Sequence, residues 1–545
     1  MKEILHQQLS QALQTLHYPA VEILLEKPKV ATHGDVTTNI AMVLAKSVGK
    51  KPREIAETII QELKIAQTII SSIEIAGPGF INFTFADSFI VESSKKVLIE
   101  GKNYGKNSSG KNIKVNIEWV SANPTGPLHS GHGRQVILGA VLANILEWNG
   151  YDVTREYYFN NAGNQMRNLA ESIYARYCEL CGENIQFPGD GYHGEYIKTI
   201  AQEIFNEKGK RITDKNYFQK KGEEWCFANI KNILTKLNVV HDVFYNEDSL
   251  YKNGKIQEVI EKFRSLDLIY EKDGATWLKA TTLGLENDRV IVKNTGEPTY
   301  RLPDIAYHCE KFLRGFDVMI DIFGADHIAT IPDVLAGVKA LGYDTTKVKV
   351  IIHQMVSFLR DGKQVKLSKR SGDAYTLDEL IEDVGKDAVY YFFVMRSANT
   401  HLEFNIDLAQ QQSEQNPVYY LQYAHARIAS ILRFAEEQNF ESKNFSAILH
   451  ATNFSRIHEK EEIELLKLLL DFPEEIQKCS ISYEPHHLTV YLREVAETFH
   501  KFYHAHRVLS EDKELMKARL ALCIMAKIVI ANGCIILGVE PKEKM

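Results

Sequence analysis

The spacing of apolar residues changes along the chain, and the changes indicate regions of different structure. In residues 1–105, stretches with helical spacing lie between stretches in which apolar and polar residues alternate. The predicted elements are a helix, a strand, two helices and a strand: 1–20, 21–30, 38–48, 52–63 and 73–85. A Gly-, Ser- and Lys-rich cluster at 101–110 is typical of a linker or turn. We therefore expect residues 1–105 to form a compact α+β domain.

Residues 111–400 alternate between short apolar runs and helical stretches. The predicted strands are 113–120, 152–159, 289–292, 319–323 and 348–353. A helix is predicted at 135–148, between the first two strands. This alternation favours a Rossmann-like α/β domain with a parallel sheet. Residues 166–285 are mostly helical and polar. We interpret them as a helical insertion between the two halves of the domain.

Residues 401–545 have helical spacing throughout, which predicts an all-α bundle. One long helix begins near Asn416, and another contains residues 500–507. The most apolar segment, 520–539, is interrupted by a lysine, an asparagine and a glycine. A membrane span needs about 20 uninterrupted apolar residues. We therefore expect a core helix here and no association with a membrane.

The junction between the strand at 113–120 and the helix at 135–148 carries the first candidate site. His129, Gly131 and His132 stand where the helix begins. Free backbone N–H groups at a helix N-terminus bind phosphates, and two histidines three residues apart share one face of the helix. We expect these three residues to bind ATP, although a pair of surface histidines is the simpler alternative. The sequence contains neither the dinucleotide fingerprint nor the P-loop motif.

A second candidate motif lies about two hundred residues further along the chain. Lys366, Ser368 and Lys369 follow an apolar run and an Asp-Gly turn. Two lysines in a loop can hold the outer phosphates of ATP as point charges. A lone charge run of this kind is more often a solvated surface. The presence of both motifs in one chain favours an ATP site in which the two histidines and the two lysines are catalytic.

These motifs resemble those of a known family. Residues 129–132 are similar to the HIGH motif, and residues 366–370 to the KMSKS motif, of class I aminoacyl-tRNA synthetases. The flanking residues 118–129 and the downstream segment 161–165 resemble arginyl-tRNA synthetases of the bacterial type. The resemblance implies a class I catalytic domain at 111–400, with an N-terminal domain that contacts tRNA and a C-terminal bundle, 401–545, that binds the anticodon.

The resemblance also implies roles for individual residues. Glu118, Tyr300 and Asp304 would line a pocket for L-arginine, and Ser121 and Asn123 would hold its α-amino and carboxylate groups. The segment 324–327 would complete the site through its aspartate and histidine. Without the resemblance, Asp304 reads as the N-cap of a helix. A carboxylate that ends a buried strand, as Glu118 does, needs a cationic partner.

The implied reaction has two steps and needs ATP with Mg²⁺. The arginine carboxylate attacks the α-phosphate, giving arginyl-adenylate and pyrophosphate, and the 3′-terminal adenosine of tRNA(Arg) then accepts the arginyl group. His129 and His132 would stabilise the α- and β-phosphates, and Lys366 and Lys369 the leaving pyrophosphate. Members of the family typically need tRNA before activation. This chain keeps both lysines, which leaves its dependence on tRNA open.

Composition bears on the partners. The 545 residues carry a net charge of −7, so tRNA would be bound by local patches. Candidate tRNA-binding residues in the predicted bundle are Tyr423, Arg427, His504 and Arg507. A bundle with core aromatics and exposed charges is the alternative. A basic cluster at 208–221 reads as a solvated helix face or as support for the acceptor end.

The seven scattered cysteines suggest free thiols in a reducing cytoplasm. Cys178 and Cys181 have half of a zinc-site spacing, but no second pair follows, so we expect no zinc. We also expect a monomer. The alternatives to an arginyl enzyme are a class I synthetase for another amino acid, a non-catalytic tRNA-binding relative and a small-molecule nucleotidylyltransferase.

Overall fold

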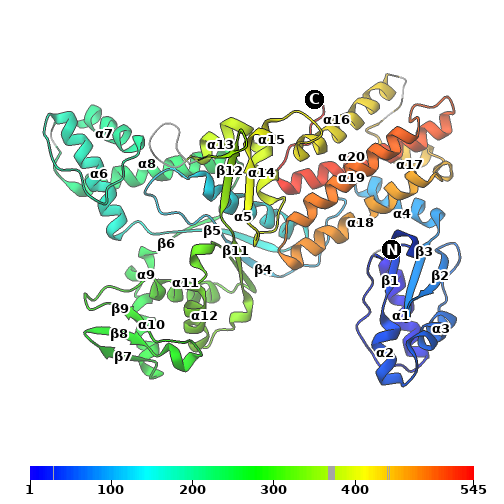
Figure 1. The fold of residues 1–545 in the computed structure, drawn as a ribbon, viewed down its shortest axis with the longest axis horizontal. Coiled ribbons are helices and arrows are strands. Elements are labelled where there is room, and N and C mark those ends of the chain that lie inside the picture. The colour runs from blue at the N-terminus through cyan, green and yellow to red at the C-terminus, as the bar shows by residue number, and fades with distance from the viewer. Residues whose placement is uncertain (29, 211, 366–374, 438–439, 441) are drawn as a thin grey trace.

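The computed structural model describes residues 1–545 except 29, 211, 366–374, 438–439 and 441. Lys366, Ser368 and Lys369 of the second motif therefore lie outside the described residues. The molecule is elongated, with a parallel sheet near its middle and a helical lobe at one end (Figure 1). At the other end a helical bundle, drawn in orange and red, lies above the blue N-terminal part of the chain.

The N-terminal part of the chain packs helices against a small antiparallel sheet of order β1-β3-β2. Its elements are α1 (Lys2–Thr15), β1 (Val36–Thr38), α2 (Ile40–Val48), α3 (Pro52–Glu62), β2 (Ile70–Ala76), β3 (Phe80–Phe85) and α4 (Asp87–Glu100). An ion pair of 2.7 Å between Asp35 and Lys467 joins it to the helical bundle.

Two strand predictions in this part of the chain are wrong. The described residues of 21–30 form no strand, and Glu26 makes a single bridge to Thr37. Pro28 contributes to this outcome, because proline has no N–H to donate to a strand ladder. The single strand predicted at 73–85 is the hairpin of β2 and β3, because Gly77 and Gly79, with φ of 52° and 142°, turn the chain between them.

The centre of the molecule is a parallel sheet of order β11-β10-β4-β5-β6 among the described residues. Its strands are β4 (Lys114–Glu118), β5 (Asp152–Phe159), β6 (Val243–Asn246), β10 (Val318–Gly324) and β11 (Val348–His353). The long helix α5 (Ser130–Trp148) follows β4 and is buried along nearly its whole length. The helix and four of the strands confirm the prediction of a Rossmann-like domain.

Two strands, β6 and β9 (Arg289–Val292), differ from the prediction. β6 lies within residues 166–285, which we predicted as a helical insertion. Residues Arg289–Val292 form β9, but this strand pairs with β8 in a separate antiparallel sheet of order β7-β8-β9. Strands of a parallel sheet are covered on both faces, and β9 buries only Ile291.

Two further lobes flank the central sheet. One is a helical lobe with its own apolar core, formed by α6 (Gly163–Cys181), α7 (Glu195–Lys208) and α8 (Lys215–Lys236). The other contains β7 (Ile269–Lys272), β8 (Ala275–Leu278), β9 (Arg289–Val292), α9 (Asp248–Lys252), α10 (Lys255–Ser265), α11 (Arg301–Leu313) and α12 (Ile331–Ala340). Figure 1 shows the two lobes on opposite sides of β6.

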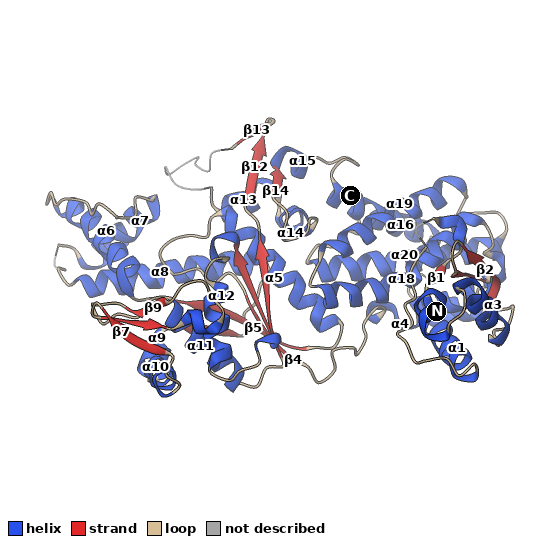
Figure 2. Cartoon of the chain, turned by 60° about the horizontal axis from the view of Figure 1, so that its bottom comes forward, coloured by secondary structure: helices blue, strands red, loops and turns tan. Residues whose placement is uncertain are grey.

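A hairpin, three helices and one further strand lie between the sheet and the C-terminal bundle. They comprise β12 (Val356–Arg360), β13 (Lys363–Gln364), α13 (Leu377–Val384), α14 (Lys386–Val394), β14 (Leu402–Asn405) and α15 (Ile406–Gln410). Figure 2 shows β12, β13 and β14 projecting from the sheet. The backbone of Ser130 donates to Tyr375 (2.7 Å) and that of Leu377 to Leu128 (2.9 Å). The segment that follows residues 366–374 is therefore bound directly to the histidine segment.

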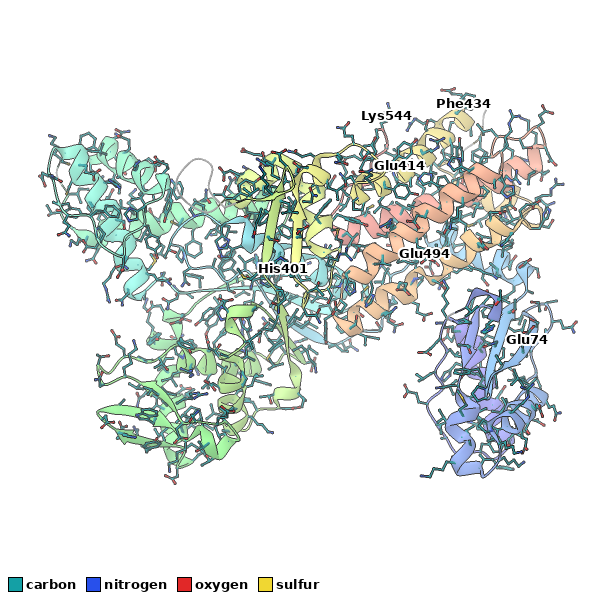
Figure 3. All side chains as sticks on the ribbon, in the orientation of Figure 1. Glu74, His401, Glu414, Phe434, Glu494 and Lys544 are labelled. Atoms are coloured by element: carbon teal, nitrogen blue, oxygen red, sulfur yellow. The ribbon has the colours of Figure 1, made fainter. Side chains whose placement is uncertain are left out.

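The C-terminal part of the chain is a helical bundle, as predicted, apart from β14 at its start. Its helices are α16 (Pro417–Glu436), α17 (Phe445–Ala451), α18 (Lys460–Ser482), α19 (His486–Ala505) and α20 (Lys513–Leu537). α20 is long and apolar enough to cross a membrane, but 83% of its most apolar stretch is buried in the protein. Figure 3 labels Phe434 near the outer end of α16 and Glu494 on α19.

Candidate active site

A cavity of about 960 Å³ lies at the carboxyl ends of β4, β10 and β11, the edge at which open α/β sheets bind ligands. Residues that we predicted from distant parts of the sequence line it together: Glu118, Ser121, Asn123, His129, Gly131, His132, Tyr300, Asp304, Asp326 and His327. The structure thus places in one cavity all the described residues that we predicted to bind arginine or ATP.

The chain turns sharply where β4 ends. Val120 and Ser121 have φ of 70° and 45°, in the left-handed region that a β-branched residue such as valine rarely adopts. As a result, the Ser121 hydroxyl donates to Glu118 at 3.0 Å and accepts from the backbone of Tyr158 at 3.2 Å. Backbone outliers of this kind concentrate at functional sites, and this one points Ser121 into the cavity.

The two histidines stand at the N-terminus of α5. Their rings stack with centroids 3.6 Å apart, and Nδ1 of His132 accepts from the backbone N–H of His129 at 3.2 Å. Burial lowers the pKa of His129, and burial with neighbouring histidines lowers the pKa of His132 to about 3. His132 is thus neutral at pH 7 and carries its proton on Nε2. A Cβ on Gly131 would lie 2.9 Å from the His129 ring, so a larger residue here would require that ring to shift.

A buried lysine neutralises the floor of the cavity. Nζ of Lys311 lies 2.6 Å from a carboxylate oxygen of Glu118 and 2.6 Å from one of Asp321, and none of the three side chains is more than 5% exposed. Burial alone would lower the pKa of Lys311, but the two carboxylates raise it above its ordinary value. Lys311 is therefore the cationic partner that Glu118 requires. It is 193 residues away in sequence, and no local pattern indicated it.

A histidine completes this floor. Nε2 of His308 lies 2.9 Å from Asp321, and its Nδ1 lies 2.7 Å from the backbone oxygen of Asp304. Both partners can only accept, so both ring nitrogens carry protons. Burial lowers the pKa of His308, but the neighbouring Asp321 raises it above its ordinary value. Two cations, Lys311 and His308, thus balance two carboxylates, Glu118 and Asp321.

Two other carboxylates in the cavity, both half-buried, form no ion pair with a Lys or Arg of the described residues. Burial raises the pKa of Asp304 to about 7. Glu247 follows β6, accepts from the Tyr158 hydroxyl at 2.7 Å and from Asn160 at 2.8 Å, and has its pKa raised by burial. Glu247 was not predicted from the sequence because β6 lies inside the predicted insertion. The pattern that could have indicated it is an acidic residue directly after a strand.

The alternative interpretation of Asp304 as a helix N-cap is wrong, because the N-cap of α11 is Tyr300.

The mouth of the cavity is polar and adjoins a smaller pocket of about 520 Å³. Tyr300 is 55% exposed there. Asn123 accepts from the backbone of Asn160 and donates to Gln165, both at 2.9 Å. Asn123 and Tyr300 line both spaces.

The predicted tRNA-binding residues lie in the helical bundle. Tyr423 and Arg427 are on α16, and the Arg427 guanidinium lies 4.7 Å from the ring of Tyr503 on α19. His504 and Arg507 are exposed at the end of α19 and just after it. The structure thus joins Tyr423 and Arg427 in one aromatic and cationic cluster, with the other two residues at the end of the neighbouring helix.

Other candidate residues have local partners. Lys208 and Lys221 pair with Glu207, and Lys215 pairs with Glu171, which favours a solvated helix face for this basic cluster; Arg211 lies outside the described residues. Within the described part of the chain, no group of three or more His, Cys, Asp and Glu side chains is arranged to hold a metal ion.

Three family models match the chain. They are described as "Arginyl tRNA synthetase N terminal domain", "tRNA synthetases class I (R), catalytic domain" and "DALR anticodon binding domain", and they match residues 3–85, 93–410 and 421–545. These matches confirm the predicted sequence of an N-terminal domain, a class I catalytic domain with a parallel sheet, and a helical anticodon-binding domain.

Full-length relatives agree with the models. An arginine–tRNA ligase of Desulfotalea psychrophila is 48% identical over 96% of this chain and 94% of its own length. One of Pelodictyon phaeoclathratiforme is 46% identical over the whole of both chains. The arginyl-tRNA synthetase structure of Thermus thermophilus has the same fold, with a TM-score of 0.78 at 20% identity over the whole of both chains. The chain therefore belongs to the class I arginyl-tRNA synthetases, the enzymes that ligate arginine to tRNA.

Proposed function

We propose that the cavity at the carboxyl ends of β4, β10 and β11 is where this enzyme forms arginyl-adenylate and passes the arginyl group to the 3′-terminal adenosine of tRNA(Arg). The observation that carries this proposal is the pair Asp304 and Glu247, two half-buried carboxylates without a Lys or Arg partner among the described residues. A planar guanidinium is the cation that two such groups bind best.

The geometry supports a division of the arginine site. Asp304 and Glu247 would bind the guanidinium, with Tyr300 covering it at the mouth. Glu118 receives a hydrogen bond from Ser121 and its charge is shared with Lys311, so Glu118, Ser121 and Asn123 would hold the α-amino and carboxylate groups. The carboxylate of arginine would then face the N-terminus of α5.

The same helix end would bind ATP. His129 and His132 are neutral donors beside the free N–H groups of α5, and Gly131 keeps the backbone open to a phosphate. Lys366, Ser368 and Lys369 would hold the leaving pyrophosphate, and Mg²⁺ would accompany ATP on its phosphate oxygens. The support for this is the backbone pairing of residues 375–377, which follow the motif in sequence, with the histidine segment. Catalysis would come from positioning and electrostatic stabilisation without a protein nucleophile.

Beyond the active site, we propose three domains: 1–105 contacting tRNA, 111–400 catalytic, and 401–545 binding the anticodon. The cluster around Tyr423 and Arg427, with His504 and Arg507 nearby, would contact the anticodon loop through stacking and phosphate contacts. Acting on tRNA during translation, the enzyme would work in the cytoplasm, as a monomer and without protein-bound zinc.

ATP–pyrophosphate exchange with each of the twenty amino acids, with and without total tRNA, tests the proposal. We expect exchange with arginine alone. If it appears only with tRNA, activation is gated by tRNA. If it appears without tRNA, the intact Lys366 and Lys369 are the expected reason. Exchange with another amino acid would refute the assignment of Asp304 and Glu247.

A further inference from the structure

Arg134 is a fully buried cation directly behind the two histidines. It lies in the first turns of α5, two residues after His132, and is 1% exposed. Its neighbour Gln135 lines the cavity, as does His132. Arg134 is therefore next to the proposed phosphate site without lining it.

All the hydrogen-bond partners found for this guanidinium are backbone oxygens. Nη1 donates to Gln354 at 2.9 Å and to Thr400 at 2.8 Å, and Nη2 donates to Ser397 at 2.8 Å. Among the described residues, no carboxylate lies within ion-pairing distance of it. Burial lowers the pKa of Arg134 only to about 10, so the group is a cation at neutral pH.

Among the described residues, the other fully buried Lys and Arg side chains, Lys311 and Arg519, are paired with carboxylates, as is the half-buried Arg314. Lys311 binds two carboxylates, Arg314 binds Glu156, and Arg519 binds Glu462. A buried charge without a counter-ion is unfavourable, and carbonyl dipoles offset only part of that cost. A neutral donor would satisfy the same carbonyls at a lower cost. The positive charge at this position therefore has a use that packing does not explain.

The three carbonyls belong to segments at the base of the β12–β13 hairpin. Gln354 lines the cavity and connects β11 to β12, and the β12–β13 hairpin leads into residues 366–374. Ser397 and Thr400 precede β14, the parallel partner of β12. One guanidinium thus ties the histidine helix to the base of the hairpin.

We propose that Arg134 is a positioning residue for adenylate formation. Its uncompensated charge adds to the dipole of α5 and stabilises the negative charge that develops on the phosphates, while its three hydrogen bonds hold the hairpin base at a fixed place relative to His132. This inference depends on the proposed binding of the phosphates at the N-terminus of α5.

Two substitutions separate the charge from the hydrogen bonds. Arg134→Lys keeps the charge with a different donor geometry, and Arg134→Gln keeps donors without the charge. Arg155→Gln is the matched control, because Arg155 binds Glu147 near the other end of α5. The measurements are arginine-dependent ATP–pyrophosphate exchange, the Kd of arginine alone and the thermal midpoint.

We expect Arg134→Gln to lower the exchange kcat by about tenfold or more, with the Kd of arginine unchanged, whereas Arg134→Lys stays within about threefold of wild type. The inference is overturned if Arg134→Gln keeps the wild-type kcat, or if Arg134→Lys loses as much as Arg134→Gln. If Arg134→Gln does not fold, Arg134→Lys decides alone: a loss of more than about tenfold overturns the inference. Wild-type exchange that does not depend on arginine would instead refute the proposed function.

Discussion

The affinity for arginine should depend on pH through Asp304. The pKa of this carboxyl is raised to about 7 by burial, so at pH 6 most of the free protein carries a proton there. Binding a guanidinium requires the ionised form and lowers the pKa in the complex. Arginine binding therefore releases a proton near pH 6, and the affinity rises as the pH increases through 7.

The size of the effect follows from the pKa. If the bound form is fully ionised, the apparent Kd scales with one plus the ratio of protonated to ionised Asp304. Between pH 8 and pH 6 this factor changes by about tenfold, or about 1.4 kcal/mol. Glu247, whose pKa is also raised, acts in the same direction and makes tenfold a lower bound.

Isothermal titration calorimetry of arginine from pH 6 to pH 8, in two buffers of different ionisation enthalpy, measures both the Kd and the protons released. Asp304→Asn should bind arginine more weakly and lose most of the pH dependence. Glu74→Gln is the control, since Glu74 is an exposed carboxylate on β2, remote from the central sheet (Figure 3). A Kd that stays constant over this range, or an Asp304→Asn variant with the full wild-type slope, would show that Asp304 does not bind the guanidinium.

Three further outcomes are expected. Lys311→Met leaves Glu118 without its cation and should cost about 3–5 kcal/mol of stability, seen as a lower thermal midpoint that a second substitution, Glu118→Gln, partly restores; an unchanged midpoint would contradict this. His132→Ala should lower the exchange kcat by about a hundredfold, and a loss below about threefold would remove it from the phosphate site. Tyr423→Ala should raise the KM for tRNA in aminoacylation without changing the Kd of arginine, whereas Phe434→Ala, at an exposed position of the same helix, should not; equal effects of the two would argue against the proposed anticodon cluster.

The position of the two histidines could be predicted from the sequence, because it depends on elements that follow one another directly along the chain. A buried strand, a loop and a helix N-terminus follow one another from residue 113 to residue 148, so the place of His129 and His132 could be predicted from spacing alone. The edge at which β4, β10 and β11 meet follows from their parallel order.

The partners of those residues were not visible, because they depend on tertiary structure. Lys311 reaches Glu118 from α11, a helix of the flanking lobe, and only the fold makes them neighbours. Glu247 was hidden because β6 is a strand of four residues within a helical stretch, and hydrophobic periodicity cannot distinguish so short a strand from its surroundings. β9 was correctly predicted as a strand but assigned to the wrong sheet, because a β-rich run does not indicate which sheet it joins.

The balance of charge under the cavity explains how the site can favour a cationic amino acid. Lys311 and His308 neutralise Glu118 and Asp321, so the floor carries little net charge. Asp304 and Glu247 remain, and their raised pKa values show that keeping both ionised is unfavourable until a cation arrives. A neutral isostere such as citrulline could not offset the cost of burying these charges, and an acidic side chain would increase it. The ammonium of a lysine substrate is a single point charge. The planar guanidinium of arginine, in contrast, can donate hydrogen bonds to both carboxylates. In the proposed site, discrimination would come from Asp304 and Glu247, two half-buried carboxylates without a Lys or Arg partner among the described residues.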